Sequence, residues 1–118
     1  MTPPIFVICE NGDLLMFASA KEACAYAESP DVESGEYPAA YDAEGHRLVL
    51  EVLEPTRVHR GWFVESIQLT PVTIRAVSET PDGIDELRRV LMDKLANHTA
   101  DVSLVDLVTE AQRALTFM

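Results

Sequence analysis

The chain has 118 residues, of which 47% are hydrophobic and 25% charged, a size and composition that fit one folded domain and exclude global disorder. Its net charge of −11 repels nucleic acid and anionic lipid and favours encounter with basic surfaces. Two cysteines make no disulfide framework, and the sequence has no leader-like segment and no apolar run of membrane-spanning length. We therefore expect a cytoplasmic protein that binds neither nucleic acid nor membrane.

The negative charge is concentrated in the first half of the chain, where residues 1–56 hold eleven acidic and two basic residues. Between Lys21 and Arg47 there is no lysine or arginine. Like charges at this density repel one another and lower stability unless something outside the chain offsets them. The alternative is that the acidity only keeps the protein soluble. The acidic residues in this gap are Glu22, Glu28, Asp31, Glu33, Glu36, Asp42 and Glu44.

A first β-hairpin is predicted at the start of the chain, where Asn11-Gly12 separates the apolar segments 5–10 and 13–18. Asn-Gly accepts the positive φ angles of a two-residue type I′ turn. Such a turn would place Glu10 opposite Asp13. Both faces of this hairpin would be apolar, so we expect it to be central in a sheet or covered on both sides.

A short helix should follow over about 20–28, because Ser19 and Glu22 have the spacing of a capping box. Pro30 would end this helix, and the acidic residues of 29–35 are expected to form a loop.

A second hairpin is predicted from residues 36–42 and 46–53, joined by a type I turn that runs from Asp42 to Gly45. Pro38 indicates that the first strand of this hairpin is bulged or lies at a sheet edge.

The second half of the chain changes from strands to helices. Residues 57–78 are predicted to be extended, with interruptions at Gly61 and Pro71. A helix should start at Thr80-Pro81, and a last helix is expected over about 102–116. The resulting ββαβββ order followed by helices predicts an α+β fold, an antiparallel sheet with two C-terminal helices packed on it. We expect one domain over 1–118, with the sheet and one short helix in 1–79 and two helices in 80–118.

The sequence offers little for catalysis or metal binding. The three histidines, His46, His59 and His98, lie in different elements without ligand spacing. Asp42, Glu44 and His46 share one turn and could form an acid–base set, but ordinary turn chemistry explains them better. We therefore expect no enzyme activity, no cofactor and no metal.

The remaining candidate is a recognition surface in which two tyrosines, Tyr37 and Tyr41, alternate with carboxylates. Tyrosine has a large contact area and a polar tip, which suits it to interfaces. The alternative is that both tyrosines are ordinary strand residues. Trp62 is a further candidate, either for partner contact or as a core aromatic residue. The predicted partner-binding residues are Asp31, Glu33, Glu36, Tyr37, Tyr41, Asp42 and Glu44.

Five short motifs follow one another in the first half of the chain: Pro3–Ile8 (PPIFVI), the Asn11-Gly12-Asp13 turn, Ser19–Glu22 (SAKE), Asp31–Tyr37 (DVESGEY) and Tyr41–Leu48 (YDAEGHRL). With these motifs the chain resembles small bacterial immunity-type proteins of polymorphic-toxin and contact-dependent inhibition systems. The resemblance covers about residues 3–53. It implies a cytoplasmic protein that binds and blocks a cognate toxin.

Two functions are compatible with these observations. The first is an immunity protein whose acidic surface binds a basic site on a toxin domain. The second is an acidic, dimeric secretion chaperone or adaptor that uses an apolar face of the first hairpin or the last helix. A homodimer is compatible with both functions.

Overall fold

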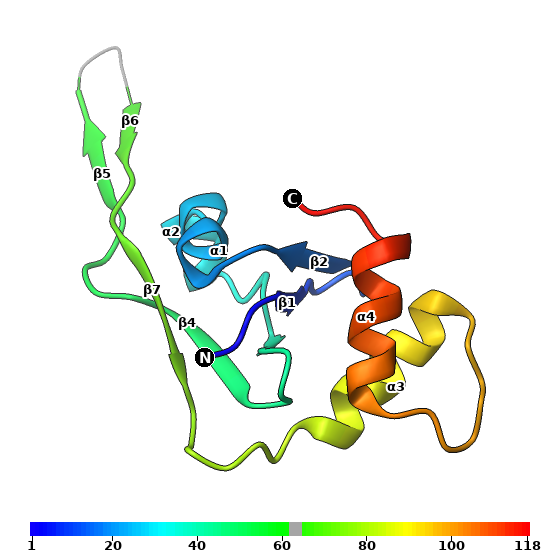
Figure 1. Ribbon diagram of the computed structural model, residues 1–118. Helices are drawn as coiled ribbons and strands as arrows, with labels where there is room; N and C mark the ends of the chain where they lie inside the picture. Colours follow the sequence, from blue (N-terminus) through cyan, green and yellow to red (C-terminus); the bar gives the residue numbers. More distant parts are fainter. Residues whose placement is uncertain (62–64) are drawn as a thin grey trace.

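The computed structural model describes residues 1–61 and 65–118, and it confirms the predicted α+β class. An antiparallel five-stranded sheet has the order β2-β1-β3-β4-β7. Its strands are β1 (Ile5–Ile8), β2 (Leu14–Phe17), β3 (Ala39–Tyr41), β4 (Arg47–Val52) and β7 (Val72–Ala76). The other elements are β5 (Arg57–Arg60), β6 (Glu65–Gln68), α1 (Ala20–Tyr26), α2 (Ser29–Glu33), α3 (Ile84–Leu95) and α4 (Leu104–Ala114) (Figure 1).

The β1–β2 hairpin forms as predicted, but its register differs by one residue because the turn has three residues rather than two. The N–H of Gly12 donates to the Cys9 carbonyl at 2.9 Å, and the N–H of Cys9 donates to Asp13 at 2.8 Å. Gly12 has a φ of +91°, whereas Asn11 does not adopt a positive φ. This is the hairpin in which one left-handed glycine closes a three-residue loop. Phe6 consequently pairs with Met16.

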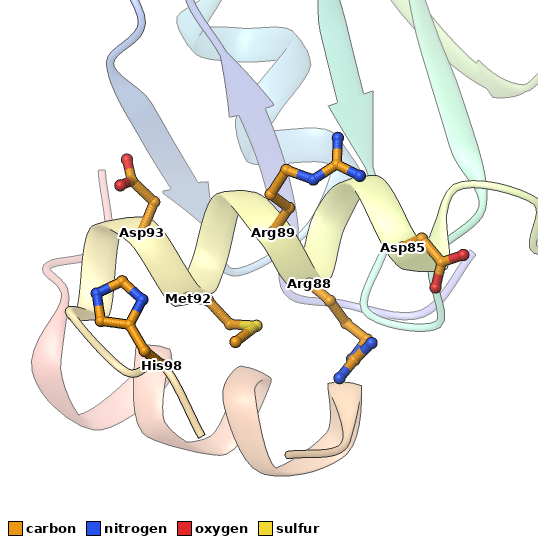
Figure 2. Close-up of a pocket in the computed structure, with 6 residues that line it drawn as sticks. All are labelled: Asp85, Arg88, Arg89, Met92, Asp93 and His98. Carbon is orange, nitrogen blue, oxygen red and sulfur yellow. The ribbon is translucent and has the colours of Figure 1, made fainter. Parts of the chain in front are cut away.

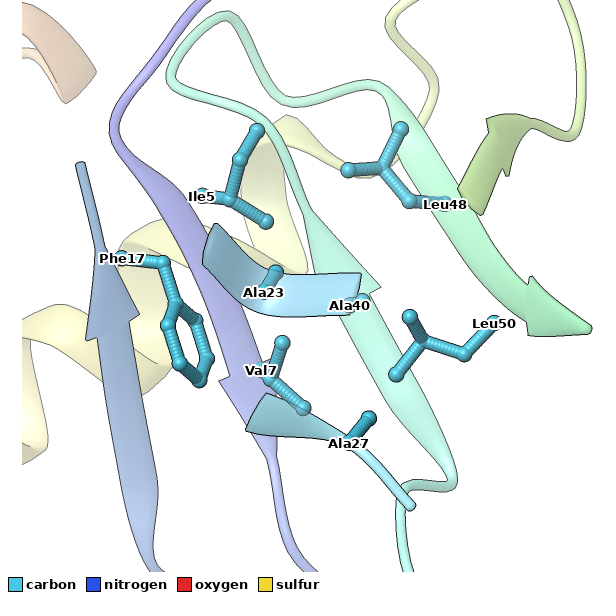
Figure 3. Close-up of a cluster of buried hydrophobic side chains, with 8 residues drawn as sticks. All are labelled: Ile5, Val7, Phe17, Ala23, Ala27, Ala40, Leu48 and Leu50. Atoms are coloured by element: carbon cyan, nitrogen blue, oxygen red, sulfur yellow. The ribbon is translucent and has the colours of Figure 1, made fainter. Parts of the chain in front are cut away.

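Both faces of the hairpin are buried, as expected from its sequence. One face contributes to a hydrophobic cluster with α1 and β4, shown in Figure 3. The other face packs against α3 and α4. Each large side chain removed from water in this way stabilises the fold by roughly 1.5–3 kcal/mol. The first cluster holds Ile5, Val7, Phe17, Ala23, Ala27, Ala40, Leu48 and Leu50. The second holds Phe6, Met16, Tyr41, Leu87, Leu91, Leu107, Val108 and Ala111.

The predicted loop at 29–35 contains a second short helix, α2, so the sheet half of the chain has two short helices rather than one. The start of α1 is as predicted, since the Ser19 hydroxyl accepts from the Glu22 N–H. Pro30 ends no helix directly; it lies in the first turn of α2, where its missing N–H is not needed.

The strand that follows Pro38 is internal rather than at an edge. β3 lies between β1 and β4, and it begins at Ala39, so the proline precedes the paired residues. The turn to β4 is as predicted, with the N–H of Gly45 donating to Asp42.

Helix α3 begins at Ile84, three residues later than Pro81, the predicted first helical residue. Its N-cap is Gly83, whose N–H donates to the Gly45 carbonyl at 2.9 Å. A side chain on Gly83 would meet the Tyr41 ring at 2.8 Å. Gly83 is therefore fixed against the β3–β4 turn, and the helix begins only after it. Helix α4 starts after the Ser103 cap, within the predicted range.

Figure 1 shows two further features of the chain, the C-terminal segment near β2 and the ribbon formed by β5 and β6. The C-terminal segment lies against β2, where the N–H of Met118 donates to the Met16 carbonyl at 2.9 Å. At the other end, β5 and β6 form a two-stranded ribbon that projects from the body of the molecule, whose longest dimension is 61 Å. Trp62 lies outside the described residues. Among the helices of the described segments, none has the length and hydropathy needed to cross a membrane.

Candidate functional site

The structure divides the predicted recognition residues between the two ends of β3. Asp31 and Glu33 lie on α2, and Glu36 and Tyr37 follow just before β3. At the opposite end, Tyr41 closes β3, and the turn to β4 begins immediately after it. The seven residues therefore do not form one continuous surface. The second group consists of Tyr41, Asp42 and Glu44.

Asp42 is fully buried, and its carboxylate organises the β3–β4 turn. The oxygen Oδ2 accepts from the Thr2 N–H at 3.0 Å, and Oδ1 accepts from the N–H groups of Glu44 and His46. Burial alone would raise the pKa of Asp42, but the bonds from Thr2 and His46 outweigh it and lower that pKa. The side chain is thus structural and does not face solvent.

His46 joins this turn to the segment that follows β7. Its Nδ1 lies 2.9 Å from Oδ2 of Asp42, and its Nε2 lies 3.2 Å from the Glu79 carbonyl. Each ring nitrogen of His46 therefore has an oxygen atom within hydrogen-bond distance. Potential ligand atoms of Asp42, Glu44 and His46 lie within 4.8 Å of one another. Because hydrogen bonds already use the Asp42 oxygens and both ring nitrogens, we interpret this group as a hydrogen-bonded turn rather than a metal centre.

Tyr41 is also buried and belongs to a polar contact beneath α3. Its hydroxyl donates to Oε2 of Glu86 at 2.7 Å, and Arg47 forms an ion pair with the same carboxylate. Burial, together with this bond to Glu86, raises the pKa of Tyr41 to about 12. Tyr41 thus fastens α3 to the sheet and is not a surface aromatic residue.

The opposite end of the sheet carries a cluster of carboxylates, which we call the acidic end and define as Glu10, Asp13, Asp31 and Glu36. Two backbone hydrogen bonds bring its loops together: the N–H of Glu10 donates to the Glu36 carbonyl at 2.8 Å, and the N–H of Glu36 donates to Asp31 at 3.0 Å. Glu10, Asp13 and Glu36 are exposed. The spacing that places Glu10 and Asp13 on either side of the hairpin turn is the sequence signal that could have found them.

The electrostatics of the acidic end are visible in its two half-buried neighbours. Burial, followed by the charges of Asp31 and Glu36, raises the pKa of Tyr37 to about 12. Burial, followed by Asp13 and Glu36, also raises the pKa of the Cys9 thiol. The carboxylates therefore act jointly on the same small region.

No carboxylate of the acidic end has a basic partner within the described residues. Every ion pair within 4.0 Å among the described residues involves an acidic residue outside this group of four. Glu33, although close in sequence, is engaged by Thr56, whose hydroxyl and N–H both donate to it and lower its pKa. The four carboxylates of the acidic end thus form no ion pair within 4.0 Å among the described residues, and a basic side chain, Lys94, shares a cavity with Asp13.

A cavity of about 440 Å³ beside α3 is the other candidate. Figure 2 shows that its labelled side chains do not converge, since Arg89 and Asp93 point to one side of the helix and Arg88 to another. The Arg88 guanidinium donates twice to the Val102 carbonyl, at 3.1 and 2.7 Å. Arg88 therefore holds the α3–α4 connection, and the cavity offers no assembled binding group.

Comparison of the chain with protein-family models, with curated proteins and with solved structures gives no match.

Proposed function

We propose that this protein is a non-enzymatic binding protein of the immunity type, which neutralises a cognate toxin domain by covering a basic site on it. The observation that carries the proposal is the acidic end, whose carboxylates on Glu10, Asp13, Asp31 and Glu36 form no ion pair within 4.0 Å among the described residues. Carboxylates on surface loops and on the short helix α2 that lack an ion pair are available to a basic partner, and they increase the rate of association through electrostatic attraction.

The acidic end also has the aromatic surface that a stable complex needs. Tyr37 is half-buried among the carboxylates, and Tyr26, which is 47% exposed, lies close enough to influence its pKa. Charges accelerate encounter, whereas buried aromatic contacts slow dissociation. Tyr41 and Asp42 have no part in this surface because they are buried at the other end of β3.

The alternative, a secretion chaperone, rested on two apolar faces that the sequence left without a partner. The two apolar faces of the first hairpin are covered by the chain's own helices, and the apolar stripe of α4 packs against α3 and the sheet. Neither surface is available to a client segment in this structure.

The proposal predicts that a neighbouring gene encodes a secreted protein with a toxic C-terminal domain, and that domain is then the binding probe. We expect the chain to protect bacteria that produce this domain and to bind it with an affinity that falls as NaCl is raised. Neutralising Glu10, Asp13, Asp31 and Glu36 together should reduce the association rate by about tenfold or more.

The matched control neutralises four exposed acids elsewhere, namely Glu79, Asp93, Asp101 and Asp106. Equal loss of binding in both variants would indicate a general charge effect rather than a docking surface. Absence of protection, or binding that depends on neither salt nor the acidic end, would refute the proposal.

A further inference from the structure

Strand β7 has one edge that pairs with no other strand in the described part of the structure. It ends the sheet order β2-β1-β3-β4-β7 and pairs only with β4. The N–H of Val77 donates to the Arg47 carbonyl at 2.8 Å, which directs the backbone groups of the odd-numbered residues of β7 toward β4. The N–H and C=O groups of Val72, Ile74 and Ala76 therefore point away from the sheet.

This edge lacks the features that usually keep an edge strand from pairing. Edge strands are commonly protected by a proline, a bulge or charged side chains. The pairing of β7 with β4 is continuous over Val72–Ala76, and Pro71 precedes the strand. The single charged side chain of β7, Arg75, forms an ion pair with Glu51, which holds it over β4 rather than at the free edge. A further strand can therefore add to β7 without displacing a protective group.

The side chains beside the free edge are apolar or uncharged apart from this ion pair. Val72 and Ile74 pack against the cluster formed by α1 and β4 but are only half-buried, and Ala76 is exposed. A strand beside β7 would extend this cluster and bury the remaining surface of all three side chains. Residues 70–77 contain no acidic residue, so the charge of the chain does not act against close approach at this edge.

The residues of β7 also match a second copy of themselves. When two β7 strands run antiparallel about a two-fold axis at Ile74, that residue meets Ile74 of the second copy, and Val72 meets Ala76. Each of these outward-facing pairs can exchange two backbone hydrogen bonds. On the other face of the sheet Arg75 meets Thr73 of the second copy, so no like charges oppose each other.

Neighbouring registers fit less well. An axis at Arg75 would bring the two arginines face to face. An axis at Thr73 would place Ala76 opposite Thr70, whose N–H already donates to the Ser29 hydroxyl. The axis at Ile74 is thus favoured by the residues themselves.

Charges beside this axis are complementary between the two copies. Glu51 lies opposite Thr73 on β4, and in the paired arrangement Thr73 lies opposite Arg75 of the second copy. A carboxylate of one copy and a guanidinium of the other would therefore flank one short threonine side chain. The side chains of Glu51 and Arg75 are 41% and 62% exposed, so each Arg75 can approach the glutamates of both copies.

We propose that the protein forms a symmetric homodimer in which β7 pairs antiparallel with β7 of a second copy and the two sheets become one. Both copies use the same edge, so the pairing is closed and needs no other protein. The dimer rests on none of the acidic residues that carry the proposed function.

Sedimentation velocity and amide hydrogen exchange of the full chain, each over a range of protein concentrations, test the proposal. We expect a concentration-dependent dimer in which the amides of Ile74 and Ala76 exchange about tenfold more slowly, or slower still, than in the monomer. The amide of Arg75 faces β4 in both states and should change much less.

A proline at the free edge should weaken the dimer without breaking the sheet. Ala76→Pro removes an outward-pointing N–H and keeps the ladder to β4, so we expect the dimer dissociation constant to rise by about tenfold or more. The control variant, Val58→Thr with Ile67→Thr, changes two exposed apolar residues of the β5–β6 ribbon and should dimerise like the wild type.

Two substitutions at the exposed Thr73 give the decisive comparison. Thr73→Arg would face Arg75 of the second copy and weaken the dimer, whereas Thr73→Glu would face the same arginine and strengthen it, by about two- to tenfold each. A general charge effect predicts the reverse order, because the chain carries a net charge of −11 and glutamate adds to it.

Three results would overturn the proposal: a wild-type monomer at all concentrations, an Ala76→Pro variant that dimerises like the wild type, or a Thr73→Arg variant that dimerises more strongly than Thr73→Glu. Loss of the dimer only in the ribbon variant would place the interface on β5 and β6 and would also overturn it. Circular dichroism melting checks that each variant folds. If Ala76→Pro does not fold, the two Thr73 variants decide.

Discussion

The N–H of Gly83 donates to the carbonyl of Gly45 across 2.9 Å, so the residue that caps α3 is fixed to the turn between β3 and β4. Neither glycine has room for a side chain. A β-carbon on Gly45 would lie 2.5 Å from Cγ1 and 2.9 Å from Cα of Ile84, and Gly45 has a φ of +89°. This close approach places the start of the C-terminal helices on the sheet.

Replacing Gly45 by alanine should therefore be severely destabilising. The added methyl group conflicts with the backbone of Ile84 as well as with the positive φ, and we expect a loss of more than about 3 kcal/mol in the free energy of unfolding. Gly12→Ala is the matched control, because Gly12 has the same φ but open space around it. Its loss should be about 1–2 kcal/mol. Equal losses in urea denaturation would contradict the close packing at Gly45.

Asp42→Asn should remove the charged acceptor at the centre of the β3–β4 turn. The amide cannot accept all the bonds from Thr2, Glu44 and His46, so we expect a loss of about 2–4 kcal/mol at neutral pH. Glu44→Gln, at an exposed neighbouring position, should change stability by less than about 0.5 kcal/mol.

The lowered pKa of Asp42 predicts how the loss of stability in the Asp42→Asn variant depends on pH. Because the pKa of Asp42 is lowered on folding, its contribution is present above the unfolded value of about 3.9 and is lost as the pH falls through the folded pKa. The stability difference between wild type and Asp42→Asn should therefore narrow below about pH 4. Urea denaturation across this pH range checks the sign, and a difference that widens on acidification would be inconsistent with it.

Tyr37 can report on the acidic end. Its pKa of about 12 should fall toward the ordinary value of about 10 in a variant with Asp31→Asn and Glu36→Gln, although burial will keep part of the shift. Carbon-13 NMR of labelled tyrosine rings separates Tyr37 from Tyr41. The pKa of Tyr41 should stay unchanged, since its shift comes from burial and Glu86. A Tyr37 pKa that did not move would show that these carboxylates lie too far away to act on it.

Ser29→Ala tests the contact between α2 and the two residues that flank the β5–β6 ribbon, Thr56 and Thr70. The buried Ser29 hydroxyl accepts from the Thr70 N–H at 3.1 Å, and its oxygen lies 2.6 Å from the hydroxyl oxygen of Thr56. Alanine would leave the Thr70 N–H without its partner, at a cost of about 1–3 kcal/mol. Ser34→Ala removes only an exposed bond and should cost less than about 0.5 kcal/mol. Faster amide exchange at Thr70 in Ser29→Ala, and not in Ser34→Ala, would identify the lost bond.

Local sequence patterns predicted most elements correctly because those patterns act within a few residues. The Asn11-Gly12 pair predicted a hairpin, and the Ser19 cap predicted the start of a helix. The register of the hairpin was wrong because the sequence does not show which turn residue takes the positive φ. The start of α3 was wrong because the contact of Gly83 with Gly45 is tertiary.

The candidate site was harder to predict for the same reason. Asp42 appeared to be a surface carboxylate because its turn is polar, but its partner Thr2 lies 40 residues away in the sequence. Conversely, Glu10 and Glu36 are distant in sequence and joined by one backbone bond. Clustering of like charges across loops depends on topology, which residue spacing alone does not provide.

The contact between Met118 and Met16 makes the two edges of the sheet differ in how far their backbone is covered. The C-terminal segment occupies part of the outer edge of β2, whereas β7 is the last strand on the other side. An exposed edge strand is a template for the addition of further chains. The single bridge at Met16 shortens the stretch of β2 with which a further strand can pair. Removing the last few residues would therefore leave both outer strands of the sheet exposed along their whole length.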